Sequence, residues 1–232
     1  FTLSLAGYMP VWEPLLIYAL GTLWYGLFNW FWFWIWREQP LRESLSLLYR
    51  ELADYCEAKY SLLTQHTDPE KALPPLLVRQ QKAVDLITQC YQQMHMLSAQ
   101  NNTDYKRMLR IFQEALDLQE HISVSLHQPE EVQKLVERSH AEEVIRWNAQ
   151  TVAARLRVLA DDILYHRLPT RFTMEKQIGA LEKIARQHPD NPVGQFCYWH
   201  FSRIARVLRT QKPLYARDLL ADKQRRMPLL PA

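Results

Sequence analysis

The stretch LLIYALGTLWYGLFNWFWFWIW, residues 15–36, decides how the rest of the chain is interpreted. It carries no charged side chain, and Asn29 is its only strongly polar one. As a helix it would be roughly 30 Å long, the thickness of the hydrocarbon core of a bilayer. Tryptophans gather in its second half, and tryptophan favours the boundary between membrane and water. The stretch therefore predicts a transmembrane helix that reaches the cytoplasm near Trp36.

Two other interpretations fit residues 15–36 less well. A buried helix of a soluble domain usually has a polar stripe, and this stretch has none. A cleaved signal peptide needs a basic start and a small-residue cleavage site, and neither surrounds it. Just before it, Glu13 is expected to be an interfacial carboxylate that reaches water, in preference to a transport role.

The composition divides the 232 residues into two unlike parts. Up to residue 37 only Glu13 and Arg37 are charged, whereas acidic and basic residues are mixed throughout the remainder. Between Arg203 and Arg226 basic residues outnumber acidic ones, which favours either a cytoplasmic location or an ordinary basic helix face. The chain starts without methionine, so we expect it to be a segment of a longer protein.

Residue usage after position 37 predicts an all-α fold. Only two of the five glycines, Gly179 and Gly194, lie in this part, and strand-rich folds need more glycines for their turns. Leucine, alanine, glutamine, glutamate and arginine are plentiful, and all of them favour helices. We expect the transmembrane helix to continue into a cytoplasmic antiparallel multi-helix bundle, because short turns join the predicted helices.

Periodicity and turn signals set the expected helix boundaries. Proline-rich and Asn/Asp-rich segments, including a turn over 66–75, separate helices predicted over 40–66, 75–100, 104–127, 129–167, 173–187, 193–211 and 213–226. In the first of these, apolar residues follow the spacing of a packed helix seam: Leu41, Leu45, Leu48, Leu52, Tyr55 and Leu62. Lys59 falls where this seam would continue and weakens it. The apolar face expected for the second comprises Leu77, Val84, Ile87, Tyr91 and Met94 or Leu97.

No catalytic, cofactor-binding or metal-binding residue is predicted, and no cofactor is expected. His121 and His127 are six positions apart and lie on different helix faces, and the other histidines lack metal-site spacing. The adjacent pairs Asp161–Asp162 and Glu142–Glu143 point in divergent directions. The three cysteines are sparse, which suits a reducing cytoplasm. With no converging catalytic groups, the chain is not expected to be an enzyme.

One aromatic segment is a candidate for an aromatic-ligand site, although helical spacing favours a core role: Phe196, Tyr198, Trp199 and Phe201. Arg206 and Arg209 follow it, a combination sometimes found in nucleic-acid-binding proteins. The net charge of only +3 and the membrane segment argue against nucleic acid. The residues of a substrate-binding site stay unknown.

Two runs resemble a known family. They are WYGLFNWFWFWIWREQPLRESLSLLYRELADYCEAKYSLL, residues 24–63, and VERSHAEEVIRWNAQTVAARLRVLADDIL, residues 136–164. Both resemble the fusaric-acid-resistance-like (FUSC-like) proteins of the bacterial inner membrane, specifically the YccS/YhfK branch and most closely its YhfK side. The resemblance implies two membrane bundles, each followed by a cytoplasmic helical region. Residues 1–37 would end the first bundle, and residues 38–232 would form the cytoplasmic domain between the two.

The resemblance leaves two functions open. Relatives are associated with export of aromatic carboxylic acids, so it implies an efflux protein whose helical domain serves assembly or gating. The alternative is a membrane-anchored scaffold without transport, whose apolar seams bind a partner or a second copy. The expected partners are the lipid bilayer, a second copy of the chain and, for the longer protein, a small aromatic acid, but no nucleic acid.

Overall fold

A computed structural model describes residues 12–35, 38–64, 69–97, 103–123, 134, 136–137, 141–165, 167, 173–190 and 192–226. Within these residues the regular elements are all α-helices and no strand occurs, which confirms the all-α prediction. The chain divides into two compact units, residues 1–40 and residues 41–232, and each is described by itself.

The first unit contains helix α1, Trp12–Ile35, whose described side chains are all exposed. Phe28 and Trp32 stack with ring centroids 5.9 Å apart, and the Thr22 hydroxyl donates to the Tyr18 carbonyl at 3.0 Å. By hydropathy, no helix in the described ranges is long and apolar enough to cross a membrane. The structure therefore does not show that the helix predicted over 15–36 crosses a membrane. Its many tryptophans and tyrosines are only partly apolar, and they lower its hydropathy. The side chain of Glu13 lies outside the described residues.

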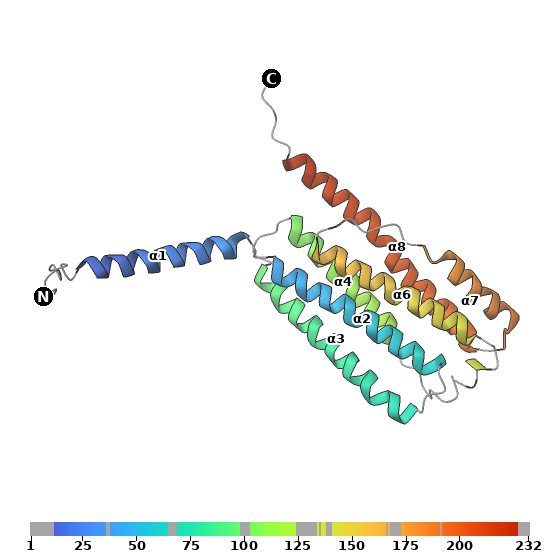
Figure 1. Cartoon of the computed structure of the whole chain (residues 1–232). Helices are drawn as coiled ribbons and strands as arrows, with labels where there is room; N and C mark the ends of the chain where they lie inside the picture. The colour runs from blue at the N-terminus through green and yellow to red at the C-terminus, as the bar shows by residue number, and fades with distance from the viewer. Residues whose placement is uncertain are drawn as a thin grey trace, which may run out of the picture. The chain divides into compact units, whose positions relative to one another are not determined.

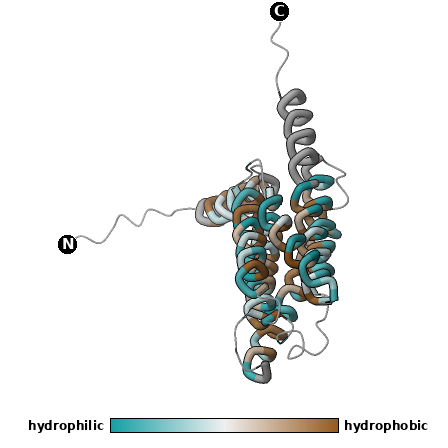
Figure 2. The backbone as a smooth tube through the Cα atoms, turned by 90° about the vertical axis from the view of Figure 1, so that its right-hand side faces the viewer, coloured by the Kyte–Doolittle hydropathy of each residue, from teal (hydrophilic) through white to brown (hydrophobic). Residues whose placement is uncertain are grey.

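The second unit is built from six labelled helices (Figure 1). They are α2 Gln39–Thr64, whose first two residues belong to the other unit, α3 Pro69–Leu97, α4 Thr103–Ser123, α6 Glu142–Leu164, α7 Glu175–Gln187 and α8 Pro192–Arg226. Along these helices the tube in Figure 2 alternates between hydrophilic and hydrophobic residues, as expected for elements that each bury one face.

Helix α3 starts six residues earlier than predicted, so the turn expected over 66–75 is wrong in its second half. Pro69 occupies the first helical position, where a missing N–H has no cost. Pro74 and Pro75 lie inside the helix. Each removes one backbone donor but keeps a helical φ, so the loss is confined to the second turn and the helix continues.

Two further boundaries differ from the prediction. Helix α6 runs from Glu142, with Ala141 as its N-cap, to Leu164, so the single helix predicted over 129–167 is interrupted at Ala141 and ends three residues early. Before Ala141, residues 134, 136 and 137 are helical, and the rest of 129–140 lies outside the described residues. Its first turn carries Glu142 and Glu143, whose negative charge suits the positive end of the helix dipole. The two helices predicted over 193–211 and 213–226 are one helix, α8, which passes through Pro213 with the loss of one backbone bond.

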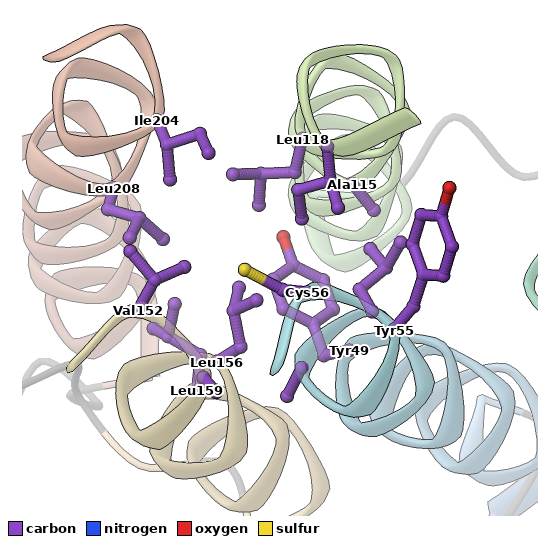
Figure 3. Packing of buried hydrophobic residues seen from close by; sticks show 14 of the residues in the cluster. Tyr49, Tyr55, Cys56, Ala115, Leu118, Val152, Leu156, Leu159, Ile204 and Leu208 are labelled. Atoms are coloured by element: carbon purple, nitrogen blue, oxygen red, sulfur yellow. The ribbon is translucent and has the colours of Figure 1, made fainter. Parts of the chain in front are cut away.

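Helix α2 is the central helix of the second unit, with 16 of its 26 residues buried. The buried set includes every member of the predicted seam, Leu41, Leu45, Leu48, Leu52, Tyr55 and Leu62, which confirms that prediction. Figure 3 shows where its side chains meet those of α4, α6 and α8: Tyr49 and Cys56 lie between Leu118 and Leu156. Burying each large apolar side chain stabilises the fold by about 1.5–3 kcal/mol.

Contacts between helices give the relative directions of three helix pairs. Glu51 pairs with Lys82, and Asp54 pairs with Arg79, so α2 and α3 are antiparallel. Tyr49 and Lys59 of α2 bond to Ile111 and Ile122 of α4, so these two helices are parallel. Arg209 of α8 pairs with Glu175 at the start of α7, whereas Gly194 of α8 lies beside Ala185 near the end of α7, so this pair is antiparallel.

Candidate functional site

Three polar side chains are buried together between α2, α4 and α8, and we call Lys59, Tyr60 and His200 the interior polar cluster. Their exposed fractions are 4%, 1% and 0%. Polar groups this deeply buried need partners inside the protein, because no water replaces a lost hydrogen bond. The cluster is therefore the candidate site of the second unit.

Lys59 lies on α2 at the position where the leucine seam is interrupted. Its Nζ donates to the carbonyl of Ile122, in the last turn of α4, where carbonyls lack partners within the helix. A cation at this end also suits the negative end of the helix dipole. Burial lowers the pKa of Lys59 to about 8. The lysine was predicted to weaken the seam, and in the structure it connects α2 to the end of α4.

Tyr60 and His200 form the second contact of the cluster. The Tyr60 hydroxyl and Nδ1 of His200 are 2.6 Å apart, and the Phe196 ring stacks on the imidazole with centroids 5.2 Å apart. Burial is the main reason that the pKa of His200 falls to about 4, and the positive charge of Lys59 lowers it further. The imidazole is therefore neutral at pH 7. Burial also raises the pKa of Tyr60 well above its usual value, so its hydroxyl keeps its proton.

Two free thiols accompany the cluster. Cys56 on α2 and Cys197 on α8 are both completely buried, and burial raises the pKa of each to about 12. Thiolate, not thiol, is the reactive species, so both cysteines are unreactive at neutral pH. Within the described residues, no group of three histidine, cysteine or acidic side chains is arranged to hold a metal ion.

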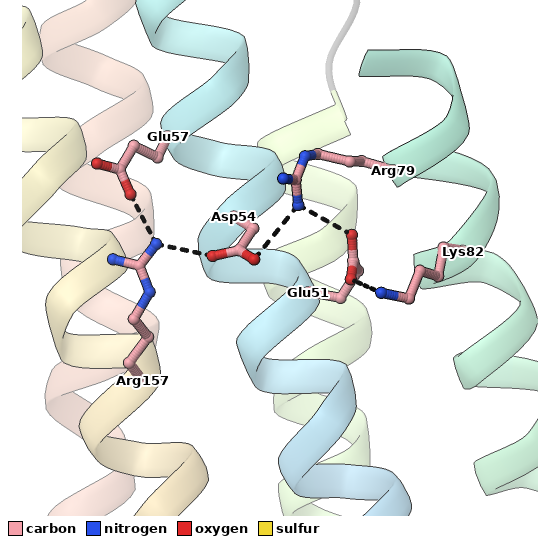
Figure 4. Close-up of polar contacts among 6 residues, drawn as sticks. All are labelled: Glu51, Asp54, Glu57, Arg79, Lys82 and Arg157. Atoms are coloured by element: carbon pink, nitrogen blue, oxygen red, sulfur yellow. Dashed lines mark hydrogen bonds and ion pairs between the residues drawn. The ribbon is translucent and has the colours of Figure 1, made fainter. Parts of the chain in front are cut away.

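A ladder of charged residues on α2 connects it to helices on both sides (Figure 4). Arg157 of α6 donates to Asp54 and to Glu57, in both cases at 2.7 Å. On the other side, Arg79 of α3 reaches Asp54 at 3.3 Å, and Lys82 reaches Glu51 at 2.5 Å. Acids spaced three residues apart fall on one helix face, which explains how one row serves two neighbours.

The aromatic group proposed for ligand binding does not form one site. Phe201 is fully buried against Tyr60, with ring centroids 4.6 Å apart, and Phe196 covers His200. Trp199 is 49% exposed and lies under the guanidinium of Arg203, at 4.9 Å. Phe201 belongs to the core and Phe196 and Tyr198 pack against it, as helical spacing favoured, whereas Trp199 stays on the surface.

The acidic pairs also separate. Asp161 is half-buried and pairs with Arg50 at 2.6 Å, whereas Asp162 is buried and its pKa is raised by that burial. Glu143 lines an open depression of about 340 Å³ on α6, beside Arg146 and Trp147.

The two histidines compared in the sequence are not brought together. His127 lies outside the described residues, and His121 is half-buried near His200.

Helix α3 carries the largest difference from the predicted core. Its buried residues are Ala83, Cys90, Met94 and Leu97, so the last position of the predicted apolar face is confirmed, and Ile87 of that face is half-buried. Three residues predicted for the apolar face are exposed instead: Leu77 by 53%, Val84 by 39% and Tyr91 by 63%. With Leu73, 43% exposed, they form a line that we call the α3 stripe. Residues seven apart stay on one side of a helix, so the four residues lie along one side of α3 over about five turns.

One family model covers residues of both units. The family model described as FUSC-like inner membrane protein yccS matches residues 1–219. The chain belongs to the FUSC-like family. No solved structure matches it.

Membership of the FUSC-like family confirms the resemblance at family level and identifies the chain as part of an inner-membrane protein. The match includes α1 and nearly all of the helical second unit, so the aromatic helix and the bundle belong to one family architecture. Within the described residues, Lys59 bonds α2 to α4 and the Tyr60–His200 contact joins α2 to α8, an arrangement that fixes the positions of these helices.

Sequence reasoning missed the interior polar cluster of this FUSC-like chain. Tyr60 and His200 are 140 positions apart, and neither lies in a motif that would connect them. A signal did exist at Lys59, because a charged residue on a leucine seam must find a partner. No comparable signal pointed to His200.

Proposed function

We propose that this chain is part of an inner-membrane efflux protein of the YhfK branch, with aromatic carboxylic acids as substrates. The observation that carries the proposal is the family match over residues 1–219. In this proposal residues 15–36 cross the membrane as the last helix of a first bundle. Residues 38–232 form a cytoplasmic domain for assembly or gating, and they catalyse no reaction.

The surface of α1 supports the membrane part of this proposal. Leu15, Ile17 and Leu20 are 63%, 70% and 61% exposed, and further along the helix Trp24 and Trp30 are 72% and 67% exposed. In water these side chains would leave a large apolar surface uncovered, whereas lipid chains and headgroups would cover it.

Transport is tested on the longer protein. Cells that lack it should accumulate more of at least one aromatic carboxylic acid from a broad panel, and expression of the protein should restore efflux. Unchanged accumulation across the panel would contradict the efflux proposal. It would not contradict membrane insertion, which needs a separate test.

Orientation is tested by side-specific labelling of one added cysteine, Lys183→Cys, at an exposed position of α7. Cys56, Cys90 and Cys197 are buried with pKa values of about 12, so the otherwise unchanged chain serves as the unlabelled control. A membrane-impermeant maleimide should label inverted vesicles and not spheroplasts. Labelling of spheroplasts would place residues 38–232 outside the cytoplasm.

A second candidate function is a membrane-anchored scaffold without transport. The exposed α3 stripe favours it, because an uncovered apolar line on a helix is a surface suited to another protein. The seam first considered for this role, Leu41 to Leu62, is buried inside the second unit and is not available.

A further inference from the structure

We propose that the α3 stripe is the contact surface between two copies of this chain. Leu77, Val84 and Tyr91 each follow the last by seven residues, the repeat of one of the two apolar positions of a coiled-coil heptad. The positions between them include Gln81 and Thr88, so the contact is sparser than a full coiled-coil seam. The helix is already packed on its other side, through Ala83, Cys90 and Met94. The stripe is therefore a second apolar side, left over after the fold is complete.

Two basic residues of α3 point away from the stripe, toward α2. Arg79 and Lys82 are turned to α2, where they pair with Glu51 and Asp54. Between the apolar residues of the stripe lie neutral side chains, including Gln81 and Thr88. The carboxylate of Asp85 borders the stripe and accepts a hydrogen bond from Gln81 at 2.9 Å, outside the line of apolar residues. Two copies can therefore bring their apolar residues together without placing these carboxylates opposite each other along that line.

The symmetry of the stripe suits a copy of itself. Leu77 and Tyr91 lie at equal distances from Val84 along the helix. In a two-fold pair with parallel helices, each residue faces its equivalent. With antiparallel helices, Leu77 faces Tyr91 of the second copy. Val84 faces Val84 in both cases, so this residue reports the contact whichever direction the helices take.

The area is sufficient for a weak dimer. Gln81 and Thr88, which flank the apolar residues of the stripe, are also exposed. Covering the stripe and these flanks in two copies removes on the order of 1,000 Å² from water, close to the minimum for a specific interface. Confinement of both copies to one membrane raises their effective concentration, and this strengthening alone depends on the proposed membrane insertion.

The test uses Val84→Cys in the full chain, expressed in bacterial membranes and treated with a mild oxidant. The pairing predicts a disulfide-linked dimer through residue 84. Adding Leu77→Glu should reduce its yield roughly tenfold or more, because it buries a charge at the contact. The matched control is Val158→Cys on α6, a valine with a similar exposed fraction of 43%, which should give no dimer.

Two results would overturn the pairing. If the cysteine introduced at position 84 reacts fully with a maleimide and forms no dimer, the stripe is open. If this cysteine is protected but joins only a different polypeptide, or nothing, another partner occupies the stripe. Alkaline carbonate extraction of the same membranes tests insertion separately: a chain that is extracted but still forms the dimer keeps the pairing and contradicts the membrane proposal.

Discussion

The hydroxyl of Tyr60 on α2 lies 2.6 Å from Nδ1 of His200 on α8, inside a core where both side chains are almost completely buried. The contact joins the central helix to the last one, 140 positions later in the sequence. It is surrounded by the rings of Phe196 and Phe201, which keep water away from it. A hydrogen bond in such a place specifies how the two helices align, because its loss leaves a polar atom unsatisfied.

Tyr60→Phe removes only the hydroxyl and should lower the free energy of unfolding by about 1–3 kcal/mol, the cost of an unsatisfied buried nitrogen. The measurement is urea denaturation followed by circular dichroism, with the chain in detergent. The matched control is Tyr165→Phe, just after α6, where the tyrosine is 61% exposed and the change should be within about 0.5 kcal/mol. Equal effects at the two positions would show that the interior contact contributes nothing.

Two adjacent leucines of α2 give a second prediction. Leu48 is completely buried, whereas Leu47 is 52% exposed. Leu48→Ala should lower the free energy of unfolding by about 2–5 kcal/mol because it leaves a cavity. Leu47→Ala should change it by no more than about 0.5 kcal/mol. The same denaturation experiment measures both, and a large loss at Leu47 would mean that the surface of α2 is covered in the protein.

Arg157 tests the charged ladder. It holds two carboxylates of α2, Asp54 and Glu57, but all three side chains are well exposed, so Arg157→Gln should cost only about 0.5–1 kcal/mol. The cost should shrink as salt rises to about 1 M, because exposed charges are screened. Arg186→Gln, which breaks a pair within α7 alone, is the control and should be near zero. A salt-independent loss at Arg157 would point to packing of its aliphatic stem instead.

The sequence was most informative where one local pattern determined the structure. The seam from Leu41 to Leu62 repeats every three or four residues, and all its members are buried. On α3 the same kind of pattern was only partly right: Met94 and Leu97 are buried as predicted, but Leu77, Val84 and Tyr91 are exposed, and Ala83 and Cys90 face the core in their place. Small and polarisable residues fit a close helix contact but carry a weak hydrophobic signal, so periodicity favoured the wrong side.

Proline explains two of the boundary errors, at the start of α3 and in the middle of α8. At 74, 75 and 213 the helices continue through proline with the loss of a few backbone bonds, whereas the prediction ended or began a helix there. The interior polar cluster could not be predicted for a different reason. It depends on a contact between α2 and α8, and a single sequence carries no information on which distant residues meet.

The last prediction concerns the pH dependence of the stability of the chain, through His200. Its pKa is about 4 in the folded chain, against 6.5 for the free side chain. Between these values the unfolded chain binds a proton that the folded chain does not, so stability falls as the pH falls from 6.5 towards 4. The contribution of this one group is on the order of 2–3 kcal/mol over that window.

Other groups also titrate between pH 6.5 and 4, so the measurement is a difference between two chains. His200→Gln keeps a partner for the Tyr60 hydroxyl but cannot titrate, and its stability should depend less on pH than that of the unchanged chain. Measurement of the same two chains above pH 7, where the imidazole of His200 is neutral, gives the cost of the substitution itself and serves as the control. If the unchanged chain and His200→Gln lose stability in parallel, His200 is not held neutral by its burial. The folded core would then accept a proton at that position without cost.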